Sequence, residues 1–257
     1  MEGFVTINNK SIFYQFIHEE YGKPSSPLLI FLHEGLGSIR QWKDFPYRLC
    51  REMKYPGILY DRFGYGRSES LIEERQHDYL HREAYDYLPA LIRELGIQNP
   101  QILVGHSDGG TISLLYASSF PEQLVAVVTI AAHVFVEDCT IKGVQSMREA
   151  YPDSRLQSAL FKYHGSKTDQ MFYAWANLWT NPGFKHWDIT EAIKNISCPL
   201  LCLQGEKDEY ATEEQLHRIE NVVKGNCNTF LIPACGHSPH LQKQSEVLAK
   251  IISFLSH

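Results

Sequence analysis

Short apolar runs and amphipathic segments alternate along most of this 257-residue chain. Continuous apolar runs are typical of strands buried on both faces, whereas apolar positions three and four residues apart are typical of helices. The predicted strands are residues 27–32, 57–61, 101–104, 124–132, 200–204 and 229–232, and the predicted helices are residues 77–95, 110–120, 212–224 and 241–255. This alternation predicts parallel β-α-β units, and therefore an α/β fold with a doubly wound, mostly parallel sheet.

Two segments depart from the alternation. Residues 4–7 and 12–16 are β-rich and flank an Asn8-Asn9-Lys10 turn, which predicts an N-terminal hairpin. Residues 133–196 lack a buried strand pattern, hold three of the four tryptophans and are too long for a plain loop. We therefore expect a core of residues 1–132 and 197–257 and a helical cap, residues 133–196, over the strand ends. The alternative is that these helices pack on the outside of the sheet.

Composition narrows the class of protein. The chain has 24 Lys and Arg against 30 Asp and Glu, a net charge of −6, and this balance argues against a nucleic-acid partner. It shows no signal peptide and no apolar run of the roughly 18–20 residues that span a bilayer, so we expect a cytoplasmic protein with no membrane partner. Its six cysteines are scattered without a Cys-x-x-Cys pair, which favours free thiols. The sequence does not indicate an oligomeric state.

Histidine is unusually frequent, with 12 residues. If all were protonated, the net charge would change from −6 to +6, so the charge depends strongly on pH near neutrality. Several of them follow predicted strands and are expected to face one site. They are His33, His106, His133, His237 and His240.

The most informative segment is Gly105-His106-Ser107-Asp108-Gly109. It fits the pattern G-x-S-x-G, directly after a predicted strand and directly before a predicted helix. A serine on such a sharp turn projects its hydroxyl clear of the sheet, and glycines at either side admit the close backbone. We therefore predict Ser107 as a nucleophile.

A serine hydroxyl needs a base, and the base needs an acid that orients it. Asp208 and His237 each lie just beyond a late predicted strand, and parallel strand ends meet at one edge of the sheet. We predict Asp208 as the acid and His237 as the base. Glu137 and Asp138, which follow another strand, are the competing acids, and His240 is the competing base.

With Ser107, Asp208 and His237 in this order, the chain resembles the α/β-hydrolase superfamily over nearly its whole length. The segments H-E-G-L-G-S (33–38) and D-R-F-G-Y-G-R-S (61–68) resemble the family's first oxyanion loop and its D-x-x-G-x-G-x-S segment. The closer resemblance is to capped bacterial hydrolases that carry H-E-G-L-G-S, G-H-S-D-G-G and C-G-H-S-P-H.

The resemblance implies an oxyanion hole formed by the backbone N–H groups of Gly35 and Asp108. One residue departs from the family, which commonly has His-Gly where this chain has His33-Glu34. A carboxylate close to a developing oxyanion is unfavourable unless it is protonated, paired or used on the substrate. We expect Glu34 to be paired, with Arg62 as its partner.

The remaining candidates concern the substrate. We expect Glu34, His133, Trp175 and Trp179 to line a pocket for a small-molecule substrate. We expect no metal and no cofactor, because Cys235, His237 and His240 match no zinc spacing and the glycine loops match no phosphate-binding pattern.

These residues favour a serine hydrolase that acts on a small carboxylic ester or lactone through an acyl-serine intermediate. A carbon–carbon bond hydrolase of ring-cleavage products is an alternative, with Arg148 and Arg155 as anchors for a substrate carboxylate. An aminopeptidase-like enzyme and a ligand receptor with the same triad are the others.

Overall fold

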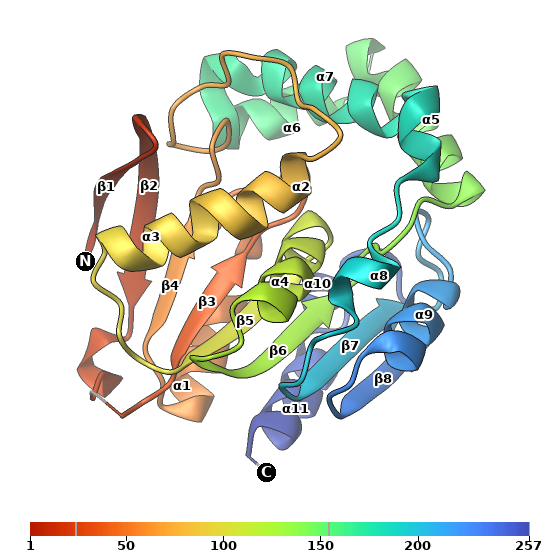
Figure 1. Cartoon of the computed structure of the whole chain (residues 1–257). Helices are drawn as coiled ribbons and strands as arrows, with labels where there is room; N and C mark the ends of the chain where they lie inside the picture. The colour runs from red at the N-terminus through yellow and green to blue at the C-terminus, as the bar shows by residue number, and fades with distance from the viewer. Residues whose placement is uncertain (24, 154, 257) are drawn as a thin grey trace.

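A computed structural model describes residues 1–23, 25–153 and 155–256, and within them the chain forms an eight-stranded sheet. The strands are β1 (Glu2–Ile7), β2 (Lys10–Ile17), β3 (Leu28–Leu32), β4 (Gly57–Tyr60), β5 (Gln101–His106), β6 (Leu124–Ile130), β7 (Leu200–Gly205) and β8 (Cys227–Ile232). Their order is β1-β2-β4-β3-β5-β6-β7-β8. The β1–β2 and β2–β4 pairs are antiparallel and all later pairs are parallel. The predicted mostly parallel α/β sheet is confirmed (Figure 1).

The N-terminal hairpin forms as predicted. Asn8 and Asn9 connect β1 and β2 and have φ values of 49° and 61°. A two-residue hairpin turn needs this left-handed backbone at both positions, and asparagine tolerates it better than other residues that carry a side chain.

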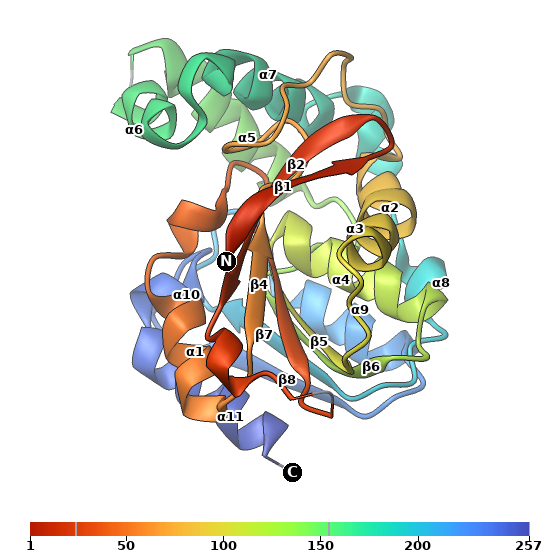
Figure 2. The same cartoon turned by 90° about the vertical axis from the view of Figure 1, so that its left-hand side faces the viewer.

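Helices cover both faces of the sheet (Figures 1 and 2). One face carries α1 (Phe45–Met53) and α11 (Gln244–Leu255), which share a buried apolar cluster with the strands. The other face carries α3 (Leu88–Glu94), α4 (Asp108–Ser119), α8 (Thr190–Ile193) and α9 (Glu214–Val222). This doubly wound arrangement leaves the carboxyl ends of the parallel strands as the edge where a site forms.

Two predicted helices are interrupted in the structure. The segment expected as one helix over 77–95 consists of α2 (Tyr79–Arg82), a π-helical turn at Glu83–Tyr87, and α3. Pro89 lies in the first turn of α3, where it lacks an N–H and its ring would meet the carbonyl four residues earlier. The preceding turn is wider as a result. Similarly, the segment expected as one helix over 241–255 starts within α10 (Pro239–Gln242), is interrupted at Lys243 and continues as α11.

The tryptophan-rich segment is helical. Its helices α5 (Asp138–Ala150), α6 (Arg155–His164) and α7 (Thr168–Trp179) lie together at one end of the sheet (Figure 1). By contrast, α8 packs against α4 and α9 at the sheet itself. We keep the division into a core and a cap of residues 133–196 as an interpretation of this arrangement.

Candidate active site

Ser107 occupies a strained turn between β5 and α4. Its φ is 52° and its ψ is −116°, a conformation that an L-residue adopts only where the surroundings impose it. The neighbouring glycines explain how the chain fits there. A Cβ on Gly105 would lie 2.2 Å from the Gly109 carbonyl oxygen, and one on Gly109 would lie 1.9 Å from the Leu32 carbonyl oxygen. The turn therefore requires glycine at both positions.

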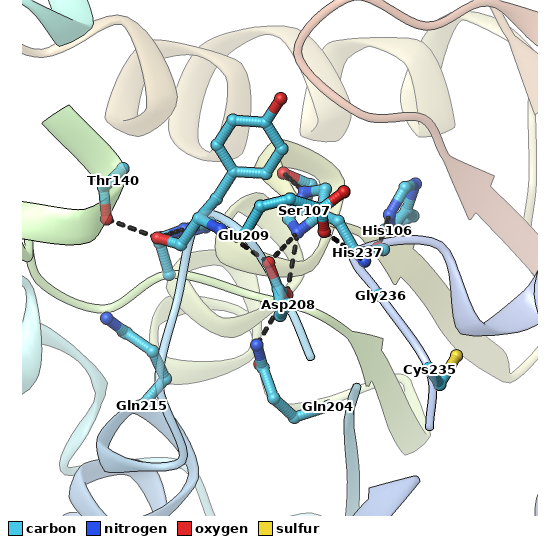
Figure 3. A network of polar contacts seen from close by, with 12 residues as sticks. His106, Ser107, Thr140, Gln204, Asp208, Glu209, Gln215, Cys235, Gly236 and His237 are labelled. Atoms are coloured by element: carbon cyan, nitrogen blue, oxygen red, sulfur yellow. Dashed lines mark hydrogen bonds and ion pairs between the residues drawn. The ribbon is translucent and has the colours of Figure 1, made fainter. Parts of the chain in front are cut away.

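Three predicted residues form one hydrogen-bonded chain (Figure 3). Nε2 of His237 lies 2.9 Å from the Ser107 Oγ, and its Nδ1 lies 2.8 Å from the Asp208 Oδ2. Gln204 donates to the same Asp208 oxygen at 2.6 Å. Burial alone would raise the pKa of Asp208, but the hydrogen bond and charge of His237 outweigh burial and lower it. Asp208 therefore stays a carboxylate that orients His237.

Glu209 was missed by the sequence reasoning. Its carboxylate accepts the backbone N–H of His237 at 3.1 Å, so it fixes the loop that carries the imidazole. Its position beside Asp208 was the available signal.

The alternative acids, Glu137 and Asp138, and the alternative base, His240, lie outside the hydrogen-bonded chain of Ser107, His237 and Asp208. Glu137 accepts hydrogen bonds from Thr212 and from the Gln215 side chain. Asp138 is exposed and pairs with Lys185 at 3.1 Å. His240 is buried, and its ring packs against Trp42, Phe45 and His106.

The peptide between Glu34 and Gly35 is anchored by its carbonyl. The Glu34 carbonyl accepts hydrogen bonds from Arg62 Nη2 at 2.9 Å and from His33 Nδ1 at 2.8 Å. The Arg62 backbone N–H donates to His33 Nε2, so the His33 proton resides on Nδ1. In a trans peptide the C=O and N–H point in opposite directions, so these bonds direct the Gly35 N–H away from Arg62. Gly35 lines the same cavity as Ser107.

Asp108 supplies the other predicted oxyanion donor. It is the first residue of α4, where a backbone N–H has no partner within the helix. Its side chain is turned into the protein, where Oδ2 accepts from Arg62 Nη2 at 3.1 Å and from the Tyr79 hydroxyl at 3.0 Å. Arg62 therefore holds both backbone segments that carry the predicted donors.

The prediction that the Glu34 carboxylate pairs with Arg62 is wrong. The Arg62 guanidinium bonds the Glu34 carbonyl and the Asp108 carboxylate, whereas the Glu34 carboxylate faces His106 Nδ1 at 3.4 Å. His106 Nε2 lies 2.8 Å from the His237 carbonyl, so this nitrogen carries a proton. Nδ1 of the neutral ring is then an acceptor that faces an acceptor oxygen of Glu34. The two atoms can form a hydrogen bond only if one of them carries a further proton. Burial raises the pKa of Glu34, but the hydrogen bond and charge of nearby histidines, His106 first, outweigh burial and lower it.

A cavity of about 120 Å³ opens above Ser107, and all four predicted pocket residues line it. Its lining residues are Glu34, Gly35, Leu36, Ser107, Asp108, His133, Thr140, Val144, Met147, Trp175, Trp179, Tyr210 and His237. Most of this lining is apolar. Burial lowers the pKa of His133, so its ring is neutral near pH 7.

The sequence reasoning missed several lining residues. Val144 and Met147 are one helical turn apart on α5, and Tyr210 follows Asp208 by two residues; this spacing was the available signal. The predicted carboxylate anchors lie outside the lining, because Arg148 is exposed beside Asn177 and Arg155 is exposed on α6.

Residues 1–23, 25–153 and 155–256 contain no group of three or more His, Cys, Asp or Glu side chains that could hold a metal ion. They also contain no helix with the length and apolar character needed to cross a bilayer. All six cysteines are free thiols.

Comparisons with known proteins agree with this fold. A bifunctional esterase/perhydrolase of Acinetobacter calcoaceticus is 28% identical over 98% of this chain and 99% of its own length. A proline iminopeptidase of Saccharolobus solfataricus is 23% identical over 99% of this chain and 92% of its own.

Among solved structures, a putative lipase from Acinetobacter baumannii superposes with a TM-score of 0.80 at 18% identity, covering 99% of this chain and 90% of that one. An enol-lactonase from Burkholderia xenovorans gives a TM-score of 0.76 at 15% identity, covering 99% of this chain and 100% of that one. A sequence model of the alpha/beta hydrolase family matches residues 29–251. The chain therefore belongs to the alpha/beta hydrolase family.

Proposed function

We propose that this chain is a serine hydrolase that cleaves a small carboxylic ester or lactone through an acyl-Ser107 intermediate. The observation that carries the proposal is the hydrogen-bonded chain from Ser107 through His237 to Asp208, which opens onto an apolar cavity. A nucleophile, a base and an orienting carboxylate in this geometry are what acyl transfer requires.

Each residue has one role in the proposed mechanism. His237 Nε2 takes the Ser107 proton as Oγ bonds to the substrate carbonyl carbon, and the carbonyl electron pair moves to oxygen. The N–H groups of Gly35 and Asp108 donate to that oxygen. Collapse expels the alcohol, to which His237 returns the proton. Water, deprotonated by His237, then releases the acid and frees Ser107.

The size of the cavity limits the acyl group. A volume of about 120 Å³ is small beside the roughly 300–1,000 Å³ of pockets that bind drug-sized ligands. Leu36, Val144 and Met147 contribute apolar lining. These features support a short acyl group rather than a long lipid chain, and the esterase/perhydrolase and enol-lactonase among the relatives support the same class.

Glu34 supports a second candidate, hydrolysis of a substrate that bears an amine. Its carboxylate lines the cavity, and a proline iminopeptidase is among the relatives. His106 already engages this carboxylate, so the ester or lactone remains the favoured substrate. The carbon–carbon bond hydrolase lacks support, because Arg148 and Arg155 lie outside the cavity lining.

The test combines active-site labelling with a substrate panel. A fluorophosphonate probe should label wild-type protein and not Ser107→Ala, as read by intact-protein mass spectrometry. Short p-nitrophenyl esters, small lactones, an amino-acyl arylamide and a dienoate ring-cleavage product then define the reaction. Hydrolysis of p-nitrophenyl acetate that persists in folded Ser107→Ala would refute the nucleophile. Labelling without turnover of any substrate would favour a ligand receptor.

A further inference from the structure

Trp175 buries an indole N–H without a hydrogen-bond partner. The side chain lies on α7 and is 9% exposed, and no atom of the described residues accepts from its Nε1. Its neighbour Trp179 differs, because its Nε1 donates to the Tyr79 hydroxyl at 2.9 Å. A buried donor without a partner is unfavourable, because it has lost the hydrogen bond that it makes with water. A ligand that supplies the acceptor is one explanation for such a group in a native structure.

The unpaired nitrogen borders the predicted oxyanion donor. Outside the residues that adjoin Gly35, Trp175 Nε1 is the nearest atom to the space that a Cβ on Gly35 would occupy, at 2.2 Å. Gly35 has no positive φ, so it is this close approach that requires glycine. The indole nitrogen therefore packs against the Gly35 backbone, and Gly35, Trp175 and Ser107 all line the same cavity.

No group of the described residues accepts this N–H. The Glu34 Oε2 atom faces His106 instead. The Tyr210 carbonyl accepts from Thr140 and lies 3.2 Å from His133 Nε2. Leu36, Val144 and Met147 contribute apolar groups. An oxygen of the bound substrate can therefore serve as the acceptor.

We propose that Trp175 Nε1–H is a third oxyanion donor, which donates to the substrate carbonyl oxygen as Ser107 attacks. This inference rests on the proposed ester or lactone hydrolysis. Oγ bonds to the carbonyl carbon, the carbonyl electron pair moves to oxygen, and His237 holds the Ser107 proton. The oxygen gains charge and accepts the indole N–H beside those of Gly35 and Asp108. A donor to a charged oxygen binds the transition state more strongly than the ground state, so Trp175 contributes to kcat.

The Trp175 donor differs from the other two in the element that carries it. The predicted donors at Gly35 and Asp108 lie in the loop after β3 and at the start of α4, both at the sheet, whereas Trp175 belongs to α7 over the strand ends. The oxyanion hole is then complete only when α7 lies over Ser107.

The experiment compares Trp175→Phe, which removes the N–H and keeps an aromatic ring, with Trp187→Phe. Trp187 is a matched control, since its Nε1 is also buried without a partner in the described chain and it lies outside the cavity lining. Initial rates with p-nitrophenyl acetate and p-nitrophenyl butyrate give kcat and KM. Inhibition by a short trifluoromethyl ketone, which forms a tetrahedral adduct on Ser107, reports oxyanion binding.

We expect Trp175→Phe to lower kcat by about 100- to 1,000-fold, the range found when one oxyanion donor is removed. KM should change less than threefold, and the trifluoromethyl ketone should bind more weakly by a factor similar to the loss in kcat. Trp187→Phe should match wild type. An unchanged kcat, or a rise in KM alone, would overturn the proposal. A loss confined to acyl groups that carry an extra oxygen would also overturn it, because the N–H would then bind a substituent.

A second measurement uses wild-type protein and does not depend on the folding of a variant. In protein labelled with ¹⁵N-tryptophan, one indole N–H resonance should move downfield when the ketone adduct forms. Trp42→Phe, Trp179→Phe and Trp187→Phe assign that resonance to Trp175 by elimination, and an unmoved resonance contradicts the proposal. Fluorophosphonate labelling and turnover by wild type are measured first. Their absence removes the proposed function and this inference together, whereas intact labelling with a neutral Trp175→Phe removes the inference alone.

Discussion

Arg62 forms a fully buried ion pair with Asp108, the residue that follows Ser107, at 3.1 Å. The same Nη2 atom donates to the Glu34 carbonyl at 2.9 Å. One guanidinium nitrogen therefore joins the two backbone segments that carry the predicted oxyanion N–H groups. A planar guanidinium suits two acceptors at fixed angles, whereas an ammonium group does not fix their geometry.

Arg62→Lys should therefore lower kcat for p-nitrophenyl acetate by about 10- to 100-fold, part of the effect of losing an oxyanion donor outright. The charge beside Asp108 is kept, but the two backbone segments lose their common anchor. KM should change little, since Arg62 lies outside the cavity lining. Initial rates and a urea denaturation curve separate this effect from loss of fold.

Tyr79→Phe is the control for Arg62→Lys. It removes the other donor to the Asp108 Oδ2 but leaves the bond between Arg62 and the Glu34 carbonyl. We expect its kcat to stay within about fivefold of wild type, because Arg62 still joins the two backbone segments. The lost bonds to the Asp108 carboxylate and from Trp179 Nε1 should lower stability instead, by about 1.5–3 kcal/mol for the bond to the charged group. Equal losses in both variants would show that the packing of Asp108, and not the joining of the two segments, determines the rate.

The acid of the triad can be tested against its competitor. Asp208→Asn should lower kcat/KM by roughly 10⁴-fold, as the corresponding change does in a serine protease, because an amide favours the wrong tautomer of the base. Glu137→Gln should stay near wild type, since Glu137 bonds Thr212 and Gln215 rather than His237. A large loss in Glu137→Gln beside a mild loss in Asp208→Asn would reverse the assignment.

Activity should fall in mildly acid solution. A protonated imidazole at position 237 cannot accept the Ser107 proton, and histidine ordinarily changes charge between about pH 5 and 8. Asp208 does not contribute to this fall, because its pKa lies below its ordinary value. A profile of kcat/KM against pH tests this expectation, and a flat profile between about pH 5 and 8 would contradict it.

The sequence was sufficient to predict that Ser107, Asp208 and His237 meet, because local patterns mark strand ends. Ser107 and Asp208 follow the fully buried strands β5 and β7, and His237 follows the half-exposed edge strand β8. Parallel strands bring their carboxyl ends to one edge of the sheet. Glycines around Ser107 mark the turn for a reason that is local and steric. These are properties of short segments, so they can be read from the order of residues.

The hydrogen-bond partners of the charged side chains could not be predicted from such local patterns. Arg62 was expected beside the Glu34 carboxylate, but its guanidinium meets the Glu34 carbonyl and Asp108. Which oxygen a guanidinium reaches depends on the paths of two separate loops, and sequence spacing says nothing about them. The π-helical turn at Glu83–Tyr87 was missed for a different reason, since the apolar stripe stays continuous through it.

Acid should also weaken the fold through His164, which ends α6. The ring is buried; Nδ1 accepts from the Gly66 N–H at 3.0 Å, and Nε2 donates to the Leu36 carbonyl at 3.1 Å. Burial lowers the pKa of His164 to about 4, from 6.5. Between these values the unfolded chain binds the extra proton, so the free energy of unfolding falls as pH falls. The loss from pH 7 to 5 should be about 2 kcal/mol.

His164→Gln tests this link, because it removes the titrating ring while the other buried histidines remain. The variant should be less stable than wild type at pH 7, since it loses hydrogen bonds to the oxyanion loop and to the Gly66 turn. It should nevertheless lose about 2 kcal/mol less than wild type between pH 7 and 5. Urea denaturation of both proteins at the two pH values measures this difference. An equal loss in the two proteins would mean that protonation of His164 does not contribute to acid unfolding.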